Sequence, residues 1–112
     1  VRYVSVLNDE AARPAMLITF DPKNNRLSLQ RVGSYQEAAD RSLQLWALPP
    51  GAAPRSLGVL TPERLLQLAA QESAVREVPA LAISLEPLGG VPSERGPTGP
   101  VLFQGALIQK QI

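Results

Sequence analysis

The chain has 112 residues, 45% of them hydrophobic, a net charge of +1 at pH 7, and neither cysteine nor histidine. A chain of this length is typical of one domain, so we expect residues 1–112 to share a single core. The composition excludes disulfides and metal sites built from thiolates or imidazoles. The nine arginines are scattered without a basic run, which predicts no direct binding of nucleic acid. No apolar run approaches the ~20 residues that a membrane-spanning helix needs.

Alternation of apolar and polar residues predicts a series of short strands along the chain. The strand-like runs are residues 2–7, 15–20, 26–32, 42–48, 56–60, 81–86 and 101–107. The run at 15–20 is apolar on both faces, as expected for a central strand covered on each side or one next to a close loop. The dense turn signal Asp-Pro-Lys-Asn-Asn at 21–25 predicts a hairpin between the second and third runs. Residues 33–41 are polar and predict a loop, with a helical turn at 36–39 as an alternative. Gly58 interrupts its run, which indicates a bulge or a close backbone approach.

The segment between residues 62 and 78 fits either a helix or a strand. Its initial Thr-Pro pair is a typical helix start, and leucines and alanines follow at helical spacing. Residues 64–68 alternatively form a strand, with a helical turn only at 73–77. We favour this second arrangement, in which Ser73 caps the short helix.

About seven or eight short strands, separated by turn residues at roughly ten-residue spacing, predict an all-β fold. We expect an antiparallel β-sandwich of the immunoglobulin-like or Greek-key type, with a barrel as the alternative. A short helix between residues 62 and 78 is the one exception that the pattern allows. A parallel sheet is excluded because the chain has no strand–helix–strand rhythm.

Residues 81–105 form the stretch around which the rest of the chain is organised. Two apolar runs flank a loop of about thirteen residues rich in glycine and proline, longer than the two to five residues of a tight hairpin. This loop is either a stiff connection between neighbouring strands or a binding loop, since long ordered loops on rigid sheets often carry function.

The chain contains little that suggests catalysis. Without histidine it lacks the usual group that titrates near neutral pH, and its two lysines, Lys23 and Lys110, lie in a turn and near the terminus. The acidic pair at 9–10 is expected to be solvated in a turn. A cluster of Asp21, Asn24 and Asn25 lacks the ligand spacing of a calcium loop and is interpreted as a turn. We therefore predict that the protein is not an enzyme and binds no metal or cofactor.

Two residues invite a functional interpretation. Trp46 is a candidate ligand-binding aromatic, but filling core or a strand edge is the more common role of tryptophan. Glu86 follows an apolar strand, and if buried it must be paired. We expect a structural ion pair with Arg41, Arg55 or Arg95, or a carboxylate bonded to the backbone.

Four motifs in a fixed order carry a family resemblance. They are LW at 45–46 before PPG at 49–51, SLGVL at 56–60, LAISLEPLGG at 81–90 and PTGPV at 97–101. They occur in this order across about half of the chain, and they resemble the C-terminal domain of the anti-sigma-K factor (RskA-type) family. Residues 64–79 depart from that pattern in being more helical. The matching positions, which the resemblance implies are structural, are Trp46, Gly58, Glu86, Pro87, Gly89, Gly90, Thr98, Gly99 and Pro100.

The resemblance implies a protein with three parts. A cytoplasmic N-terminal segment, absent from this chain, binds and sequesters a sigma factor, and a single transmembrane helix, also absent, anchors the protein in the cytoplasmic membrane. This chain is then the extracytoplasmic (periplasmic) domain, and site proteases release the sigma factor for transcription. The family offers no catalytic residues.

Two alternatives come from the residues themselves. In one, the Gly/Pro loop at 88–100 and Trp46 line a pocket for a cell-envelope compound, and a polar cleft beside Trp46 would support this. In the other, an exposed sheet edge makes the chain a self-association module and a homo-oligomer.

Overall fold

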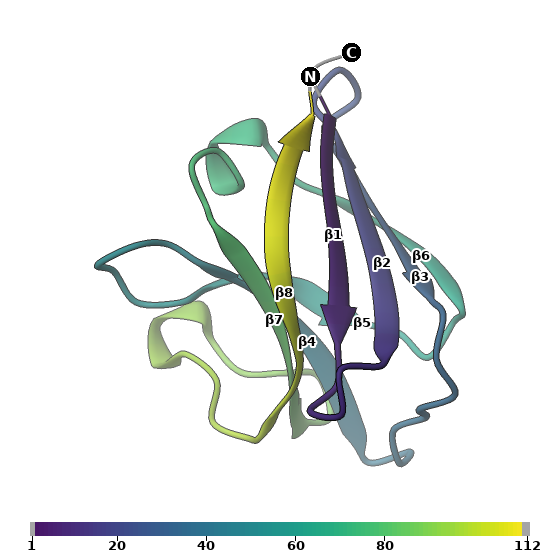
Figure 1. Ribbon diagram of the computed structural model, residues 1–112. Helices are drawn as coiled ribbons and strands as arrows, with labels where there is room; N and C mark the ends of the chain where they lie inside the picture. The colour runs from purple at the N-terminus through teal and green to yellow at the C-terminus, as the bar shows by residue number, and fades with distance from the viewer. Residues whose placement is uncertain (1, 111–112) are drawn as a thin grey trace.

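The computed structural model describes residues 2–110, and these residues form an all-β structure (Figure 1). The strands are β1 (Arg2–Asn8), β2 (Pro14–Asp21), β3 (Arg26–Arg31), β4 (Arg41–Leu48), β5 (Arg55–Leu60), β6 (Leu65–Ala69), β7 (Ala80–Pro87) and β8 (Val101–Lys110). Two three-residue 3-10 helices, η1 (Glu72–Ala74) and η2 (Ser93–Arg95), lie in the loops on either side of β7. No helix within residues 2–110 is long and apolar enough to span a membrane.

All eight strands belong to one sheet, in the order β5-β4-β7-β8-β1-β2-β3-β6, and every neighbouring pair is antiparallel. The sheet curls until its two edge strands, β5 and β6, approach each other. The contact is close, since a Cβ on Gly58 of β5 would lie 2.9 Å from a methyl carbon of Leu68 in β6. The predicted all-β, antiparallel class is confirmed. In detail, a single nearly closed sheet takes the place of two separate layers.

The core fills the inside of this curled sheet, and the alternation along the strands explains it. In β3, for example, Leu27 and Leu29 point inward and are 1% exposed, while the residues between them are more accessible. Tyr3 and Phe20, which face each other across β1 and β2, pack edge to face with ring centroids 5.7 Å apart. Such burial of apolar side chains is the main stabilising contribution available to a chain without disulfides.

Strands β4 and β7 are buried on both faces. Leu45 and Ile83 are opposite each other on the inner face, and both are fully buried in the core. On the outer face the buried residues are Ser42, Gln44, Trp46, Ala82, Ser84 and Glu86. We call these six residues the outer strip. The Gly/Pro loop, residues 88–100, bonds to several of them and covers the strip.

The ambiguous segment resolves into strand β6 followed by η1, as favoured from the sequence. The helix is, however, a single 3-10 turn at residues 72–74, not a helix at 73–77. The predicted cap by Ser73 is wrong, because Gln71 holds the N-cap position and makes no side-chain capping bond. The alternative helical turn at 36–39 does not form either, since only residues 39 and 40 adopt a turn.

Gly58 lies at the seam between the two sheet edges. The pairing of β5 with β4 shifts register opposite it, between Leu45 and Trp46, so the bulge expected at this glycine is present. Its φ is +147°, a backbone conformation that side chains disfavour, and Leu68 occupies the space where a Cβ would lie. Both the backbone and the packing at the seam therefore require glycine.

We predict that Gly58→Ala lowers the free energy of unfolding by about 1–3 kcal/mol, through backbone strain and the clash with Leu68. The double variant Gly58→Ala/Leu68→Ala should be less destabilised than the sum of its single variants, with a coupling of at least about 0.5 kcal/mol. Urea denaturation of the four proteins measures this coupling. Strictly additive losses would show that the two edge strands do not depend on this contact.

Candidate functional site

The Glu86 side chain, near the end of β7, is the centre of a polar network beneath the Gly/Pro loop. The residue is fully buried, and its Oε2 accepts a hydrogen bond of 2.6 Å from the Ser84 hydroxyl. The Thr98 hydroxyl donates to Oε1, and the backbone N–H groups of Thr98 and Gly99 donate to both oxygens at 3.1–3.3 Å. The carboxylate thus holds the end of the loop against β7.

No cation pairs with this carboxylate within residues 2–110. The expected ion pair with Arg41, Arg55 or Arg95 is therefore wrong, and the alternative of a backbone-bonded carboxylate is correct. Arg55 instead donates to the carbonyl of Ala74. Fixed donors in the loop supply what an arginine would have supplied, because N–H and O–H groups aimed at a buried carboxylate stabilise its charge.

Trp46 extends the network into β4. Its indole Nε1–H donates to the Ser84 hydroxyl at 2.9 Å, and the same hydroxyl donates onward to Glu86. Trp46 is fully buried, and its one polar atom is already bonded. A tryptophan in this position fills the layer between sheet and loop and cannot stack on a ligand.

The pKa of Glu86 reflects two opposing effects. Burial of the carboxyl raises its pKa, but the hydrogen bonds from Ser84, Thr98 and Gly99 together outweigh burial and hold the pKa below its usual value. A carboxyl whose pKa is lowered on folding stabilises the protein above its unfolded pKa. That contribution is lost as the pH falls through the lowered, folded-state pKa.

A second set of bonds holds the first half of the loop. The Gln44 amide accepts from the N–H of Val91 at 2.9 Å and donates to the carbonyl of the same residue at 3.0 Å. The Ser42 hydroxyl accepts from the N–H of Gly89, and the N–H of Ser56 donates to the Ser93 hydroxyl, both at 2.9 Å. The loop is therefore tied to the sheet along its length, which favours the interpretation of a stiff connection.

Gly99 is placed where no side chain fits. A Cβ on this residue would lie 1.8 Å from the carbonyl oxygen of Leu85 and 3.8 Å from the carboxyl carbon of Glu86. This close approach lets the N–H of Gly99 reach the buried carboxylate. The neighbouring carbonyl of Pro100 accepts from the N–H of Leu85 at 2.9 Å, which fixes the same crossing from the other side.

The structure brings most of the family-motif residues together. Trp46 and Glu86 lie in the outer strip, and Gly89, Gly90, Thr98, Gly99 and Pro100 lie in the loop that covers it. Pro87 ends β7 directly before that loop, whereas Gly58 lies at the seam. The carbonyl of Pro87 accepts from the N–H of Gly90 at 2.8 Å and closes the turn after β7. A Cβ on Gly90 would collide with Val59 and with the Gln44 amide.

Three members of the network, Ser42, Gln44 and Ser84, were missed from the sequence. The register makes the pattern clear, because Ser42 lies opposite Glu86 and Gln44 opposite Ser84 on β4 and β7. Polar residues at alternate positions of both strands were the available signal. Period-two alternation does not show whether the face that carries these residues meets solvent or a covering loop, so it did not identify them as buried.

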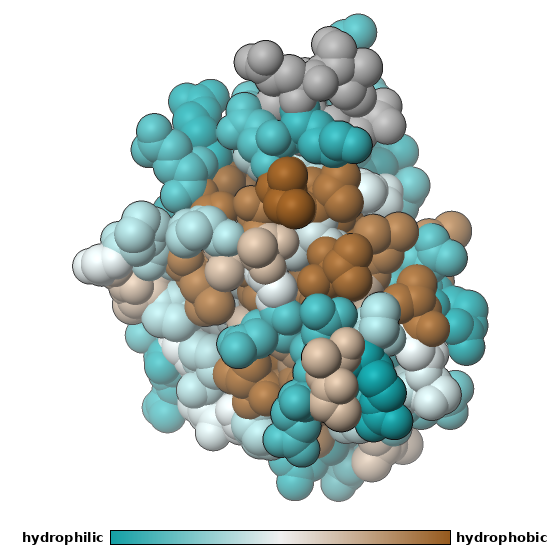
Figure 2. Space-filling view, viewed as in Figure 1, coloured by the Kyte–Doolittle hydropathy of each residue, from teal (hydrophilic) through white to brown (hydrophobic). Residues whose placement is uncertain are grey.

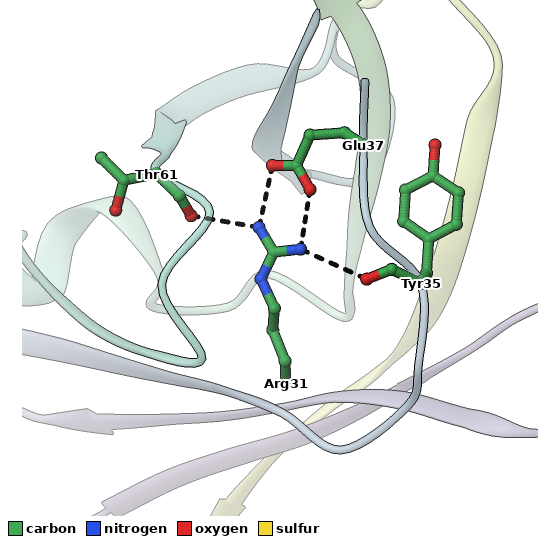
Figure 3. A network of polar contacts seen from close by, with 4 residues as sticks. All are labelled: Arg31, Tyr35, Glu37 and Thr61. Atoms are coloured by element: carbon green, nitrogen blue, oxygen red, sulfur yellow. Dashed lines mark hydrogen bonds and ion pairs between the residues drawn. The ribbon is translucent and has the colours of Figure 1, made fainter. Parts of the chain in front are cut away.

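A second buried polar cluster fixes the loop between β3 and β4 (Figure 3). The Arg31 guanidinium forms a two-pronged ion pair with Glu37 at 2.8 and 2.9 Å, and both side chains are less than 10% exposed. Arg31 also donates to the carbonyls of Thr61 at 3.0 Å and Tyr35 at 3.5 Å. The hydrogen bonds that the Glu37 carboxylate accepts from Arg31 hold the pKa of Glu37 below its usual value, against the opposing effect of burial.

The remaining candidates occupy ordinary turns. Asp21 accepts from the N–H of Lys23 and the amide of Asn24, at 3.0 and 2.7 Å, as in the turn interpretation of that cluster. Within residues 2–110 no three acidic, histidine or cysteine side chains converge to hold a metal ion. The Glu86 network encloses its carboxylate and can fix a loop, but it presents no reactive group to solvent.

The comparisons with known proteins give one match. The family model described as anti-sigma-K factor RskA, C-terminal, matches residues 1–101, which include every residue of the Glu86 network. Neither a curated protein nor a solved structure matches the chain.

Replacement of Glu86 tests the network directly. Glu86→Gln puts an amide donor against the donors of Thr98 and Gly99, and we expect the free energy of unfolding to fall by about 2–4 kcal/mol. Glu94→Gln, the same change at an exposed position of η2, should alter it by less than about 0.5 kcal/mol. Urea denaturation followed by Trp46 fluorescence measures both. Equal, small effects would contradict the role of the buried carboxylate.

The pH dependence of stability gives an independent check. The pKa values of Glu86 and Glu37 are lowered on folding, so the wild-type free energy of unfolding should fall as the pH drops below about 4.3, the usual glutamate pKa. Glu86→Gln should show a shallower fall over the same pH range, because one of these carboxyls no longer titrates. Denaturation series at fixed pH values compare the slopes, and parallel curves would exclude this assignment for Glu86.

The Arg31–Glu37 pair should behave as a buried ion pair. Arg31→Met leaves Glu37 without its partner, and we expect a loss of about 3–5 kcal/mol in unfolding free energy. Adding Glu37→Leu should recover a large part of that loss, because no uncompensated charge remains. Arg76→Met, which breaks the exposed 3.6 Å pair with Glu72, is the matched control and should cost less than about 1 kcal/mol. No recovery in the double variant would contradict the assignment.

Proposed function

Because this chain belongs to the anti-sigma-K factor RskA C-terminal family, we propose that it is the extracytoplasmic regulatory domain of a transmembrane anti-sigma factor. The family match over residues 1–101 carries the proposal. In the proposed whole protein, a cytoplasmic N-terminal segment sequesters a sigma factor and a single transmembrane helix joins that segment to this domain. The protein is regulatory and not an enzyme.

The proposed mechanism uses the stability of the domain. In its folded state the domain hides a membrane-proximal segment from a site protease, and opening of the domain exposes that segment. Cleavage then tracks the population of opened molecules, which depends on the free energy of opening. The polar network supports this mechanism, because one carboxylate, Glu86, holds both the Ser84 strand and the 98–99 end of the loop. A signal that breaks these bonds would release the loop.

The alternative of a ligand-binding module requires Trp46 to line a pocket, and the position of Trp46 argues against this. Trp46 is fully buried, and it lines neither of two surface clefts of about 690 and 500 Å³. The Gly/Pro loop is bonded to the sheet where the pocket was expected. Neither of these two clefts is therefore the polar cleft beside Trp46 that would support this alternative.

Self-association keeps a specific observation in its favour. Apolar side chains gather on the outer face of β8, β1 and β2 (Figure 2). Val6 and Ile108 are 43% and 58% exposed there, and Val4 lies opposite Ile108. An exposed apolar patch of this kind is typical of a surface that contacts another protein. Light scattering on the isolated domain, compared with the Ile108→Lys variant, would measure dimer formation through this face.

Deletion of the domain from the full-length protein tests the proposed function. We expect transcription of the sigma-dependent target to rise without any signal, because the protected segment is exposed. A full-length protein carrying Glu86→Gln should show a smaller rise, and one carrying Glu94→Gln should match the wild type. Reporter transcription and immunoblots of the cleaved fragment are the measurements. Unchanged transcription after deletion would refute the proposal.

A further inference from the structure

A cleft of about 690 Å³ opens at the end of the sheet where β1 stops short. This volume is in the range of pockets that bind ligands, roughly 300–1,000 Å³. Three separate runs of the chain line it: the turn after β1 with the start of β2, residues 33–35, and residues 100–103, where β8 begins. Lining by consecutive residues indicates that backbone, and not only one face of a strand, borders the cleft.

The first residues of β8 have a strand on one side only. On the β7 side Val101 lies opposite Ser84 and Phe103 opposite Ile83. On the β1 side the pairing ends at Asn8 and Gln104, so in the part of the chain that the structure describes residues 101–103 have no partner strand there. A strand segment with one unpaired side presents backbone donors and acceptors that can pair with an added strand.

The turn after β1 cannot fill this position. Asp9 closes it tightly, because its N–H donates to the carbonyl of Arg13 at 2.9 Å and its carboxylate accepts from the N–H groups of Ala11 and Arg13. These bonds to the carboxylate hold the pKa of Asp9 below its usual value. The chain therefore turns away into β2 and leaves the cleft beside β8 open.

Side chains around the cleft add specificity to this backbone edge. Tyr35 is 38% exposed, and its ring is held edge-on against Phe103 with centroids 5.6 Å apart. Val101 is 46% exposed beside it. Glu10, which also lines the cleft, is exposed and forms no ion pair with another residue of the described range 2–110, whereas its neighbour Asp9 pairs with Arg13. The cleft thus combines an apolar platform with an unpaired negative charge.

We propose that this cleft binds an extended polypeptide segment carrying basic residues, which adds as a short strand beside residues 101–103. Backbone hydrogen bonds to the start of β8 supply affinity, Tyr35 and Val101 contact one face of the added segment, and Glu10 attracts a basic side chain. The true sheet edges are poorer sites for this addition, because β5 and β6 face each other at the Gly58–Leu68 seam.

The probe is the hexapeptide Lys-Val-Thr-Val-Arg-Thr-amide with fluorescein on its N-terminal amino group, which leaves both basic side chains free and favours an extended conformation. Fluorescence anisotropy should show saturable binding of this peptide with a dissociation constant below about 1 mM. In ¹⁵N-labelled protein, amide shift changes should gather at residues 9–10, 35 and 101–103. Absence of saturation, or shift changes centred on β5 or β6, would overturn the proposal.

Two controls separate backbone pairing from other modes of binding. Glu10→Lys should weaken binding about three- to tenfold, while Glu63→Lys, the same charge change at an exposed position away from the cleft, should leave it nearly unchanged. A peptide N-methylated at every backbone amide should lose measurable binding, because neither of its two edges can then donate hydrogen bonds to a strand. Equal binding of the methylated peptide, or equal effects of the two variants, would refute strand addition. These results do not bear on the proposed anti-sigma function.

Discussion

The fold around the outer strip depends on a buried carboxylate that has no counter-ion among residues 2–110. Glu86 keeps its charge because two hydroxyls and two backbone N–H groups, from Ser84, Thr98 and Gly99, are aimed at it. A buried carboxylate deprived of these donors would cost several kcal/mol, so the donors and the carboxylate must stay together. This requirement joins a loop of weak intrinsic structure to the most buried strands of the sheet.

The same constraint explains why β4 and β7 are covered on both faces. Their inner residues form the apolar core, while the outer residues form a polar layer whose groups are satisfied by the Gly/Pro loop. The loop contributes its backbone to the bonding, and glycine is needed where it approaches the sheet, most clearly at Gly99. Breaking one part of this layer exposes unsatisfied groups in the rest, which makes it a cooperative unit.

The strands were predictable because alternation records the inner face directly, as with Leu27 and Leu29 in β3. Except for Ser84 on the same strand, the partners of Glu86 were not, because Thr98 and Gly99 lie 12 and 13 residues away across an irregular loop with no periodicity. The Arg31–Glu37 pair joins a strand end to another such loop and has no local signature. Glu86 itself could be identified as a residue that needs partners, because it stands at the end of an apolar strand directly before Pro87, where its side chain can be buried.

The first and last strands of the described chain are neighbours in the sheet, and Arg2 lies opposite Lys110 (Figure 1). Tension applied between those two residues would act across the ladder and not along it. The hydrogen bonds between β1 and β8 would then break one after another, beginning at the end of the pair where Arg2 and Lys110 lie. Pulled between these two residues, the domain would therefore open strand by strand from β1 and β8, and its core would not have to give way all at once.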